Sequence, residues 1–197
     1  MTDLRVGVLA LQGDFALHAR LVTALGHSVS EVRTPVDMRG IDALILPGGE
    51  STTISMGIER EGLAEPIRAM HSAGAPIFGT CAGMVLLGRG HLGLIDAAVE
   101  RNAFGRQVHS FEADLVVSGV AGDPIRALFI RAPAVTDLGP GVQVLAEVDG
   151  RPVAIREGNV TAISFHPELI GEGRLHSLAL GESAPTDDAP AAAQSLS

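Results

Sequence analysis

The chain has 197 residues, with 23 acidic residues against 14 basic ones and a formal net charge of -9. This length allows one domain with a sizeable core, and the acidic balance repels a phosphate backbone, so nucleic acid is not expected as a partner. No stretch approaches the roughly 18 uninterrupted apolar residues of a membrane span, and the N-terminus lacks the pattern of a secretory signal. The sequence therefore predicts a cytoplasmic protein that does not enter a membrane.

Two absences limit the chemistry that this chain can perform. A single cysteine, Cys81, excludes an intramolecular disulfide and suits a reducing compartment. All 14 basic residues are arginine, so the chain can neither form a lysine Schiff base nor supply the lysine of a phosphate-binding P-loop. One cysteine and scattered histidines have no spacing typical of metal ligands, so no metal and no cofactor are predicted.

The first half of the chain alternates predicted strands with predicted helices. The strands are expected over 4–11, 29–32, 43–46 and 76–78. The helices are expected to begin after Asp14, which can act as a cap, at Ser51, at Pro66 and after Cys81. Because the strands are apolar nearly throughout, this rhythm predicts a parallel, doubly wound sheet that is covered on both faces.

The second half contains shorter strand-like segments separated by Gly, Pro and Asp. These segments are 111–117, 128–130, 142–148, 153–155 and 161–165. We interpret them as strands added to the same sheet together with a small antiparallel layer. One domain is therefore expected over 1–181, followed by a disordered tail over 182–197 that is rich in Pro, Ala and Ser.

The most specific local pattern is Gly79-x-Cys81-x-Gly83, between a predicted strand and a predicted helix. This is the pattern of a nucleophile elbow with cysteine in place of serine. Its glycines permit a tight turn that presents the side chain at the carboxyl edge of the sheet, and the N-terminus of the following helix favours a thiolate. A buried cysteine that acts as a small hydrophobe is the alternative, and the flanking glycines favour the nucleophile.

A thiolate nucleophile needs a base, and seven histidines could supply it. His18 falls in a predicted helix, where a solvated face explains it, and His176 has no special local context. His166 follows directly after a predicted strand, at the sheet edge where Cys81 is expected, and Glu168 is close enough to orient its ring. Alone, His-Pro-Glu could equally be a surface turn, but together with the elbow it indicates a Cys-His-Glu triad.

A third segment, Pro47-Gly48-Gly49-Glu50-Ser51, also lies between a predicted strand and a predicted helix. The backbone N–H groups of such a loop can face an anion or a developing oxyanion, because glycine allows close approach. The alternative is an ordinary connection in which Ser51 caps the helix. Three loops of this kind at one sheet edge favour a site.

Together these segments resemble class I (triad) glutamine amidotransferases and, more narrowly, the family of glutaminase subunits of pyridoxal 5'-phosphate synthase. The similarity covers nearly the whole chain before the tail, in GVLALQGD, LPGGESTT, FGTCAGM, ERNAFGRQVHSFEADL, FIRAP and SFHPEL. The first, fourth and fifth of these segments distinguish this family from other triad glutaminases. The resemblance implies a single-domain, flavodoxin-like α/β fold with a small antiparallel addition.

By that resemblance, Cys81 is the nucleophile and His166 and Glu168 are its partners in hydrolysing L-glutamine to L-glutamate and ammonia through a glutamyl thioester. The residues expected to hold glutamine are Gly49, Glu50, Ser51, Arg106, Ile130 and Arg131. Backbone N–H groups of Gly49 and Ala82 are expected to form the oxyanion hole. Gln12 is expected near the synthase subunit, the partner that would receive the ammonia and carry the lysine chemistry.

Two features depart from the family pattern. After Leu87 the chain passes through Gly88-Arg89-Gly90 to HLGL, where relatives usually have a longer segment, and the final helix is curtailed at 178–181. Three alternatives therefore stay open: a triad glutaminase that feeds another synthase, a cysteine hydrolase, and a non-catalytic binding subunit. The intact triad and the ERNAFGRQ and FIRAP segments favour the glutaminase subunit.

Overall fold

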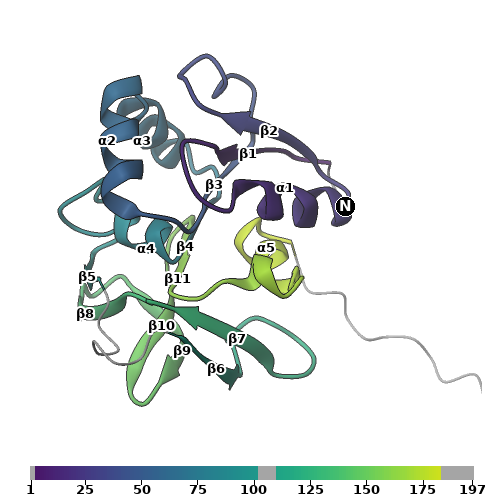
Figure 1. The fold of residues 1–197 in the computed structure, drawn as a ribbon, viewed down its shortest axis with the longest axis vertical. Helices are drawn as coiled ribbons and strands as arrows, with labels where there is room; N and C mark the ends of the chain where they lie inside the picture. Colours follow the sequence, from purple (N-terminus) through teal and green to yellow (C-terminus); the bar gives the residue numbers. More distant parts are fainter. Residues whose placement is uncertain (1–2, 102–109, 183–197) are drawn as a thin grey trace, which may run out of the picture.

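The computed structural model describes residues 3–101 and 110–182. Its centre is a seven-stranded sheet with the strand order β2-β1-β3-β4-β11-β10-β9 (Figure 1). In this order the strands are Ser28–Val32, Arg5–Leu9, Ala43–Leu46, Ile77–Thr80, Val160–Ile163, Arg151–Glu157 and Gln143–Val148. The first five run parallel, and β10 and β9 continue the sheet by antiparallel pairing. The predicted α/β fold with a mostly parallel sheet is confirmed.

The parallel strands form where the sequence is apolar on both faces. Every residue of β3, β4 and β11 is buried, and Arg5 is the one exposed residue of β1. Strands of this kind need cover on both sides, which the helical connections supply. The order β2-β1-β3-β4 is that of flavodoxin-like sheets, whose ligands bind at the carboxyl edge.

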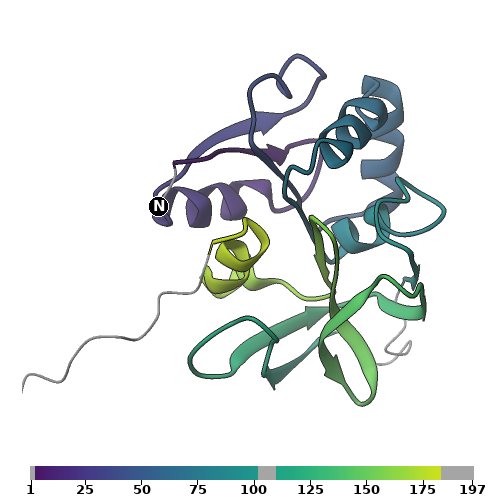
Figure 2. The ribbon, with the colours of Figure 1, turned by 180° about the vertical axis from the view of Figure 1, so that it is seen from behind.

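Helices cover both faces of the sheet. Their bounds are Phe15–Ala24 (α1), Ser51–Glu61 (α2), Ala64–Ser72 (α3), Ala82–Leu87 (α4) and Arg174–Ala179 (α5), with a 3₁₀ helix η1 at Pro167–Leu169. α1 and α5 lie next to each other on one face, whereas α2, α3 and α4 pack on the other (Figures 1 and 2). The sheet therefore separates two cores, one centred on Phe78 and Leu175 and the other on Leu44 and Met84.

Two antiparallel ribbons extend the molecule beyond the central sheet. β6 (Ser110–Leu115) pairs with β7 (Ile125–Ile130), and β5 (Ala97–Glu100) pairs with β8 (Ala134–Leu138). The sequence predicts strands over 111–117 and 128–130 and a small antiparallel layer without saying which strands form it, and it predicts neither strand of the second ribbon. The segments AAVE and AVTDL are short and show little alternation of apolar and polar residues, which is the signal for a half-buried strand.

Four neighbouring strands place the candidate site at one edge of the sheet. β1, β3, β4 and β11 are adjacent and parallel, so their carboxyl ends meet there. Gln12 follows β1, the Gly48-Gly49 loop follows β3, Cys81 follows β4 and His166 follows β11. Segments that are far apart in the sequence are thereby brought into contact.

The short segment after α4 is packed against the core. Leu92, Leu94 and Ile95 are buried and belong to the core on the face of α2, α3 and α4. α5 is only six residues long, but its Leu175 is fully buried in the opposite core. Both short segments are therefore integral parts of the fold.

No helix in the described part of the chain is long and apolar enough to cross a membrane. The tail predicted to be disordered over 182–197 lies outside the described residues, except for Glu182. The N–H of Glu182 donates to Ser177 O at 2.9 Å, and its carboxylate lies 3.2 Å from His27 Nε2.

Candidate active site

Cys81 lies between β4 and α4 in a strained backbone conformation. Its φ of 48° and ψ of -105° lie outside the regions that non-glycine residues normally adopt. Such a conformation costs on the order of 1–3 kcal/mol and persists only where the surroundings impose it. The Cys81 N–H donates to Ile163 O at 2.8 Å, so the neighbouring strand β11 helps to hold the turn.

The two flanking glycines make room for close packing around this turn. A Cβ atom on Gly79 would lie 2.8 Å from the backbone of Gly83, and a Cβ atom on Gly83 would lie 2.1 Å from Leu46 O. Neither glycine has a positive φ, whereas Cys81 does. The glycines are therefore needed for close approach, and the strain lies in the cysteine itself.

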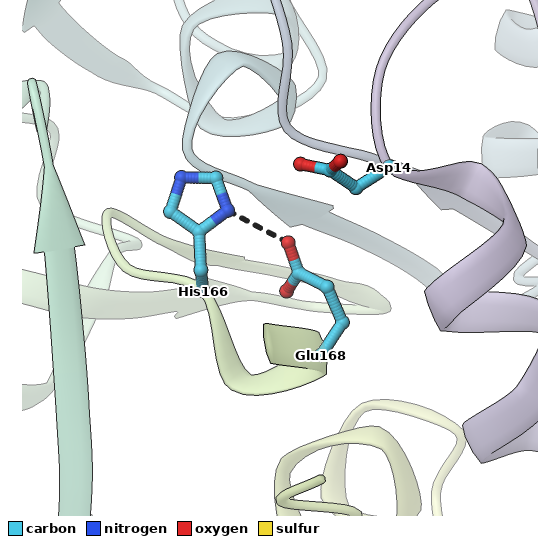
Figure 3. A group of neighbouring side chains, drawn as sticks. All are labelled: Asp14, His166 and Glu168. Carbon is cyan, nitrogen blue, oxygen red and sulfur yellow. Dashed lines mark hydrogen bonds and ion pairs between the residues drawn. The ribbon is translucent and has the colours of Figure 1, made fainter. Parts of the chain in front are cut away.

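His166 and Glu168 form a buried pair at the end of β11. His166 Nδ1 lies 2.7 Å from Glu168 Oε1 (Figure 3). Glu168 is in η1, and this turn carries its carboxylate back to the ring. The backbone N–H of His166 donates to Leu128 O at 3.0 Å, which ties the residue to β7. The two residues are only 5% and 4% exposed, so solvent screens this interaction weakly.

The surroundings of His166 favour a protonated ring. Burial alone would lower its pKa, but hydrogen bonds with Cys81 and Glu168 raise the pKa to about 10. The ring therefore carries a positive charge at neutral pH, placed between the sulfur and the carboxylate. A positive charge at this position favours the thiolate, the nucleophilic form of cysteine.

The loop after β3 packs directly against these residues. A Cβ atom on Gly48 would lie 2.5 Å from His166 Cε1 and 3.5 Å from Cys81 Cβ, so a side chain there would displace the ring. On the other side of the loop, the Gln12 side-chain oxygen accepts from Glu50 N–H at 2.7 Å. The loops after β1 and β3 are thus held together beside the triad.

Glu50 is the residue that caps α2, in place of the Ser51 considered from the sequence. Its carboxylate accepts from the N–H groups of Thr52 and Thr53 at 3.1 and 2.8 Å. The backbone hydrogen bonds from Thr53 and Thr52 lower the pKa of Glu50 to about 2. Arg101 Nη2 lies 3.0 Å from the same carboxylate, which places an ion pair beside the site.

The triad borders a cavity of about 280 Å³. This volume is near the lower end of the range for small-molecule sites, which suits a small polar ligand. The predicted site residues that line it are Gln12, Gly49, Glu50, Ser51, Cys81, Ala82, Ile130, Arg131 and His166. Glu168 is behind His166, bonded to its ring. Arg106, the remaining predicted residue, lies outside the described residues.

The cavity is also lined by five residues that were not predicted from the sequence to belong to the site: Asp14, Val85, Arg101, Pro133 and Leu169. Arg101 belongs to the ERNAFGRQ segment, so the family resemblance of that segment could have indicated Arg101 as a site residue. Asp14 occupies the N-cap position of α1, but its side chain makes no capping hydrogen bond, contrary to the expected role. Its carboxylate instead lies near His166 and Glu168 (Figure 3).

Asp14, His166 and Glu168 each bring one potential metal ligand within 4.8 Å of the others. His166 Nδ1 already interacts with Glu168, and the raised pKa of His166 means that a metal ion would compete with a proton for this ring. The cluster is therefore better described as the acidic side of the triad than as a metal site.

The interpretation of His18 as a residue on a solvated face is wrong. His18 and His176 are both 0% exposed. The face of α1 that carries His18 would meet solvent in an isolated helix, but α5 packs against it (Figures 1 and 2). Local sequence cannot reveal this, because the covering helix is far away in the chain.

Comparisons with known proteins agree with this architecture. The model of the SNO glutamine amidotransferase family matches residues 8–182. A protein of Parafrankia sp. (strain EAN1pec) named "Pyridoxal 5'-phosphate synthase subunit PdxT" is 51% identical over 187 residues, which cover 90% of this chain and 92% of that protein. A protein of the same name from Rhodococcus opacus (strain B4) is 48% identical over 194 residues, covering 90% of this chain and 96% of that one.

A solved structure agrees as well. A crystal structure described as a glutamine amidotransferase superimposes with a TM-score of 0.84 at 47% sequence identity, and covers 89% of this chain and 97% of that one. The family match therefore extends over the sheet, the elbow and the His166 turn together. This chain belongs to the SNO glutamine amidotransferase family.

Proposed function

We propose that this chain hydrolyses L-glutamine to L-glutamate and ammonia by means of a Cys81-His166-Glu168 triad. The observation that carries the proposal is the buried His166–Glu168 pair, 2.7 Å apart, with His166 and the strained Cys81 lining the same cavity. Membership of a glutamine amidotransferase family supports a carboxamide as the group that is attacked.

The first half-reaction forms a thioester. Cys81 Sγ attacks the side-chain carboxamide carbon of glutamine, and the carbonyl oxygen becomes an oxyanion. We assign its stabilisation to the N–H groups of Gly49 and of Ala82, which lies in the first turn of α4, where N–H groups have no partner within the helix. One such donor typically contributes about 3 kcal/mol. His166 gives its proton to the nitrogen, the C–N bond breaks, and ammonia leaves a glutamyl thioester.

The second half-reaction releases glutamate. His166, now neutral, takes a proton from water, and the water oxygen attacks the thioester carbon. The C–S bond breaks, glutamate leaves, and the Cys81 thiolate and protonated His166 are restored. Proton transfer of this kind typically contributes roughly a hundredfold to ten-thousandfold. Glu168 keeps the His166 ring oriented throughout, because it accepts at Nδ1.

The residues that line the cavity are the proposed glutamine contacts. These are Gly49, Glu50, Ser51, Ile130 and Arg131. The Cys81 sulfur lies 3.9 Å from Ile130 O, so the Ile130-Arg131 turn faces the nucleophile directly. We add Arg106 as the partner of the free carboxylate of glutamine, because a guanidinium binds a carboxylate through two hydrogen bonds.

We propose further that the ammonia passes to a pyridoxal 5'-phosphate synthase subunit. The names of relatives about 50% identical to this chain support this partner. The composition supports it as well, since a chain with no lysine cannot form lysine imines and needs a second chain for that chemistry. We place Gln12 near that partner. Because Gln12 holds Glu50 N–H, a partner bound there would act on the substrate loop directly. The free catalytic thiol supports a cytoplasmic location.

The test is glutamate release from glutamine by the purified chain, alone and with a pyridoxal 5'-phosphate synthase subunit, with Cys81→Ala as the blank. The proposal expects release that the subunit stimulates and that disappears in Cys81→Ala. A folded wild-type chain that releases no glutamate in either setting would exclude the glutaminase and leave a binding subunit. Equal rates with and without the subunit would exclude the proposed coupling to the partner.

A further inference from the structure

A chain of buried polar side chains continues behind the triad into the core. His18 Nε2 lies 3.5 Å from the second carboxylate oxygen of Glu168, Oε2. The same nitrogen lies 3.1 Å from Thr80 Oγ1, one residue before Cys81. His18 Nδ1 lies 2.8 Å from His176 Nε2. Helices α1 and α5 and strand β4 thus each bring one polar group to the back of the active site.

None of these groups is accessible to water. His18, Thr80 and His176 are 0% exposed, and Glu168 is 4% exposed. Glu168 Oε2 is buried without a hydrogen-bond partner among the described residues, and His18 Nε2 is the group that faces it. A carboxylate oxygen left unpaired in a protein interior is costly, so a donor directed at it stabilises both its charge and its position.

The contacts of the two histidines indicate which nitrogens carry protons. His176 Nδ1 makes no hydrogen bond of ordinary geometry in the described part of the chain, although burial lowers the pKa of this ring and the Glu172 backbone acts to raise it. Because a buried N–H without a well-placed acceptor is costly, we assign the ring proton to Nε2. His176 then carries its proton on Nε2 and donates it to His18 Nδ1. A neutral His18 must in turn carry its proton on Nε2, where Thr80 Oγ1 at 3.1 Å is the hydrogen-bond partner and Glu168 Oε2 lies 3.5 Å away. The reverse assignment would place a bare nitrogen lone pair against the Glu168 carboxylate.

We propose that His18 is a positioning residue of this active site, which places its Nε2–H beside Glu168 Oε2 and keeps the carboxylate in the orientation that holds His166, while His176 fixes the tautomer of His18. The inference rests on the proposed role of Glu168 in the triad. It adds two residues that lie outside the cavity and touch neither the nucleophile nor the substrate.

The charges around His18 require it to be neutral in this role. Burial, then the neighbouring His176 and His166, hold the pKa of His18 well below its usual value, and burial lowers the pKa of His176 to about 4 even though Glu172 acts in the opposite direction. A charged His18 would compete with His166 for the single negative charge of Glu168. A neutral donor orients the carboxylate and leaves that charge to His166.

Two substitutions at His18 separate positioning from packing. The amide of glutamine reaches the place of Nε2, so His18→Gln keeps a donor toward Glu168. The amide of asparagine reaches only the place of Nδ1, so His18→Asn keeps the contact with His176 and loses the donor. His27→Asn is the matched control, because His27 is also buried but lies against Leu4 and Glu182, away from the site.

The first readout is glutamine turnover with the synthase subunit present. His18→Asn is expected to lower kcat by roughly tenfold to a hundredfold at unchanged KM, the size of effect known for outer-shell partners that orient metal ligands. His18→Gln should retain most of the wild-type kcat, and His27→Asn should match the wild type. Circular dichroism of each variant confirms that it is folded before its kcat is compared.

The second readout needs neither substrate nor partner. Cys81 is the only cysteine, so the rate of its alkylation by iodoacetamide against pH reports the triad alone. His18→Asn is expected to move this profile to higher pH, because a misplaced Glu168 supports the protonated His166 less well and so favours the thiolate less. His18→Gln should restore the wild-type profile.

The two readouts distinguish a failure of the proposed role of His18 from a failure of the proposed glutaminase function. A folded His18→Asn variant with the wild-type kcat and alkylation profile would overturn the role of His18. Equal losses of kcat in His18→Asn and His18→Gln with an unchanged alkylation profile would also overturn it, since that pattern marks a packing role. A wild-type chain without Cys81-dependent glutamate release would instead contradict the proposed function, and the alkylation profile would still test His18.

Discussion

At the scale of single residues, the active site depends on one strained cysteine and one tightly enclosed histidine. Cys81 keeps its unusual backbone because β4, α4 and a hydrogen bond to Ile163 O all constrain it. His166 is enclosed by Glu168, Cys81 and the backbone of Gly48. Small changes beside either residue should therefore act on the chemistry more strongly than on the fold.

Glu168→Gln should uncouple the triad without unfolding the chain. The substitution removes the negative charge that, after Cys81, raises the pKa of His166, so this pKa is expected to fall from about 10 toward its usual value. Glutamate release should fall by roughly a hundredfold or more, as for other triads that lose the acidic member. The measurements are kcat and the pH titration of the His166 ring by NMR. Glu112→Gln, on the exposed face of β6, should change neither, and an unaltered titration in Glu168→Gln would contradict the assignment.

Gly48→Ala should disable the site through contact alone. The new methyl group would lie 2.5 Å from His166 Cε1 and 3.0 Å from Nδ1, so the ring must move away from Glu168. We expect glutamate release to fall while the chain stays folded, since the overlap is with side-chain atoms of His166 and not with backbone. Gly173→Ala, where the nearest atom would be Leu25 Cδ2 at 3.4 Å, is the control for replacing a glycine by alanine. Retained activity in Gly48→Ala would show that the ring tolerates displacement.

At the scale of secondary-structure elements, α4 is short and sits very close to the end of β3. All six of its residues are buried, and Gly83 allows its backbone to approach Leu46 O. α2 approaches its neighbour less closely, because a Cβ atom on its Gly57 would meet only the end of the Leu11 side chain at 3.0 Å. The position of the nucleophile thus depends on the contact between α4 and β3.

Substitutions of two buried glycines, Gly83 in α4 and Gly57 in α2, should therefore differ in sign or size. Gly83→Ala is expected to lower the free energy of unfolding by about 1–3 kcal/mol or more, since the rigid Leu46 carbonyl lies 2.1 Å from the new Cβ atom. Gly57→Ala should be close to neutral, because the flexible Leu11 side chain can move and alanine favours the helix by roughly 0.5–1 kcal/mol. Urea unfolding of the two variants measures the difference. Equal destabilisation would contradict the proposed tight contact.

At the scale of the whole molecule, the sheet separates two apolar cores, and one of them contains buried titratable side chains where it borders the triad. His18 and His176 lie in the core between α1, α5 and the sheet, directly behind the triad. The fold therefore keeps two titratable rings neutral inside its hydrophobic interior. This arrangement couples stability to pH.

Acid should destabilise the fold before its carboxylates titrate. The pKa values of His18 and His176 are lower in the folded chain than the usual value of 6.5, so the unfolded chain binds more protons below that pH. This contribution to stability is complete above pH 6.5 and is lost as the pH falls toward 4, by roughly 1 kcal/mol per pH unit for each ring. The raised pKa of His166 adds no slope in this window, because its contribution is already complete below pH 6.5.

Urea unfolding between pH 6.5 and 5 measures this dependence. His176→Gln, which cannot take up a proton, should flatten the slope, and His91→Gln, which alters an exposed histidine, should leave it unchanged. A wild-type chain with constant stability over this window would show that the two rings are not kept neutral.

Much of the architecture could be predicted because its signals are local. The apolar runs at 43–46 and 161–165 predicted β3 and β11, and the glycines around Cys81 predicted a turn between a strand and a helix. β5 and β8 could not be predicted, since their short segments become strands only by pairing with each other. The cap of α2 was missed for a similar reason, because Glu50 and Ser51 are both plausible and their side-chain geometry decides.

The sequence by itself determined the candidate chemistry: a cysteine in an elbow, a histidine and a glutamate two residues apart, and no lysine. These properties follow from residue type and short spacing, which need no knowledge of the fold. Only the tertiary structure decided which groups surround them. Tertiary packing places Asp14 and Arg101 in the lining of the cavity. It also brings His18 into contact with His176, which is 158 positions away in the chain. Contacts between distant segments arise from the packing of helices on the sheet, and no local pattern encodes them.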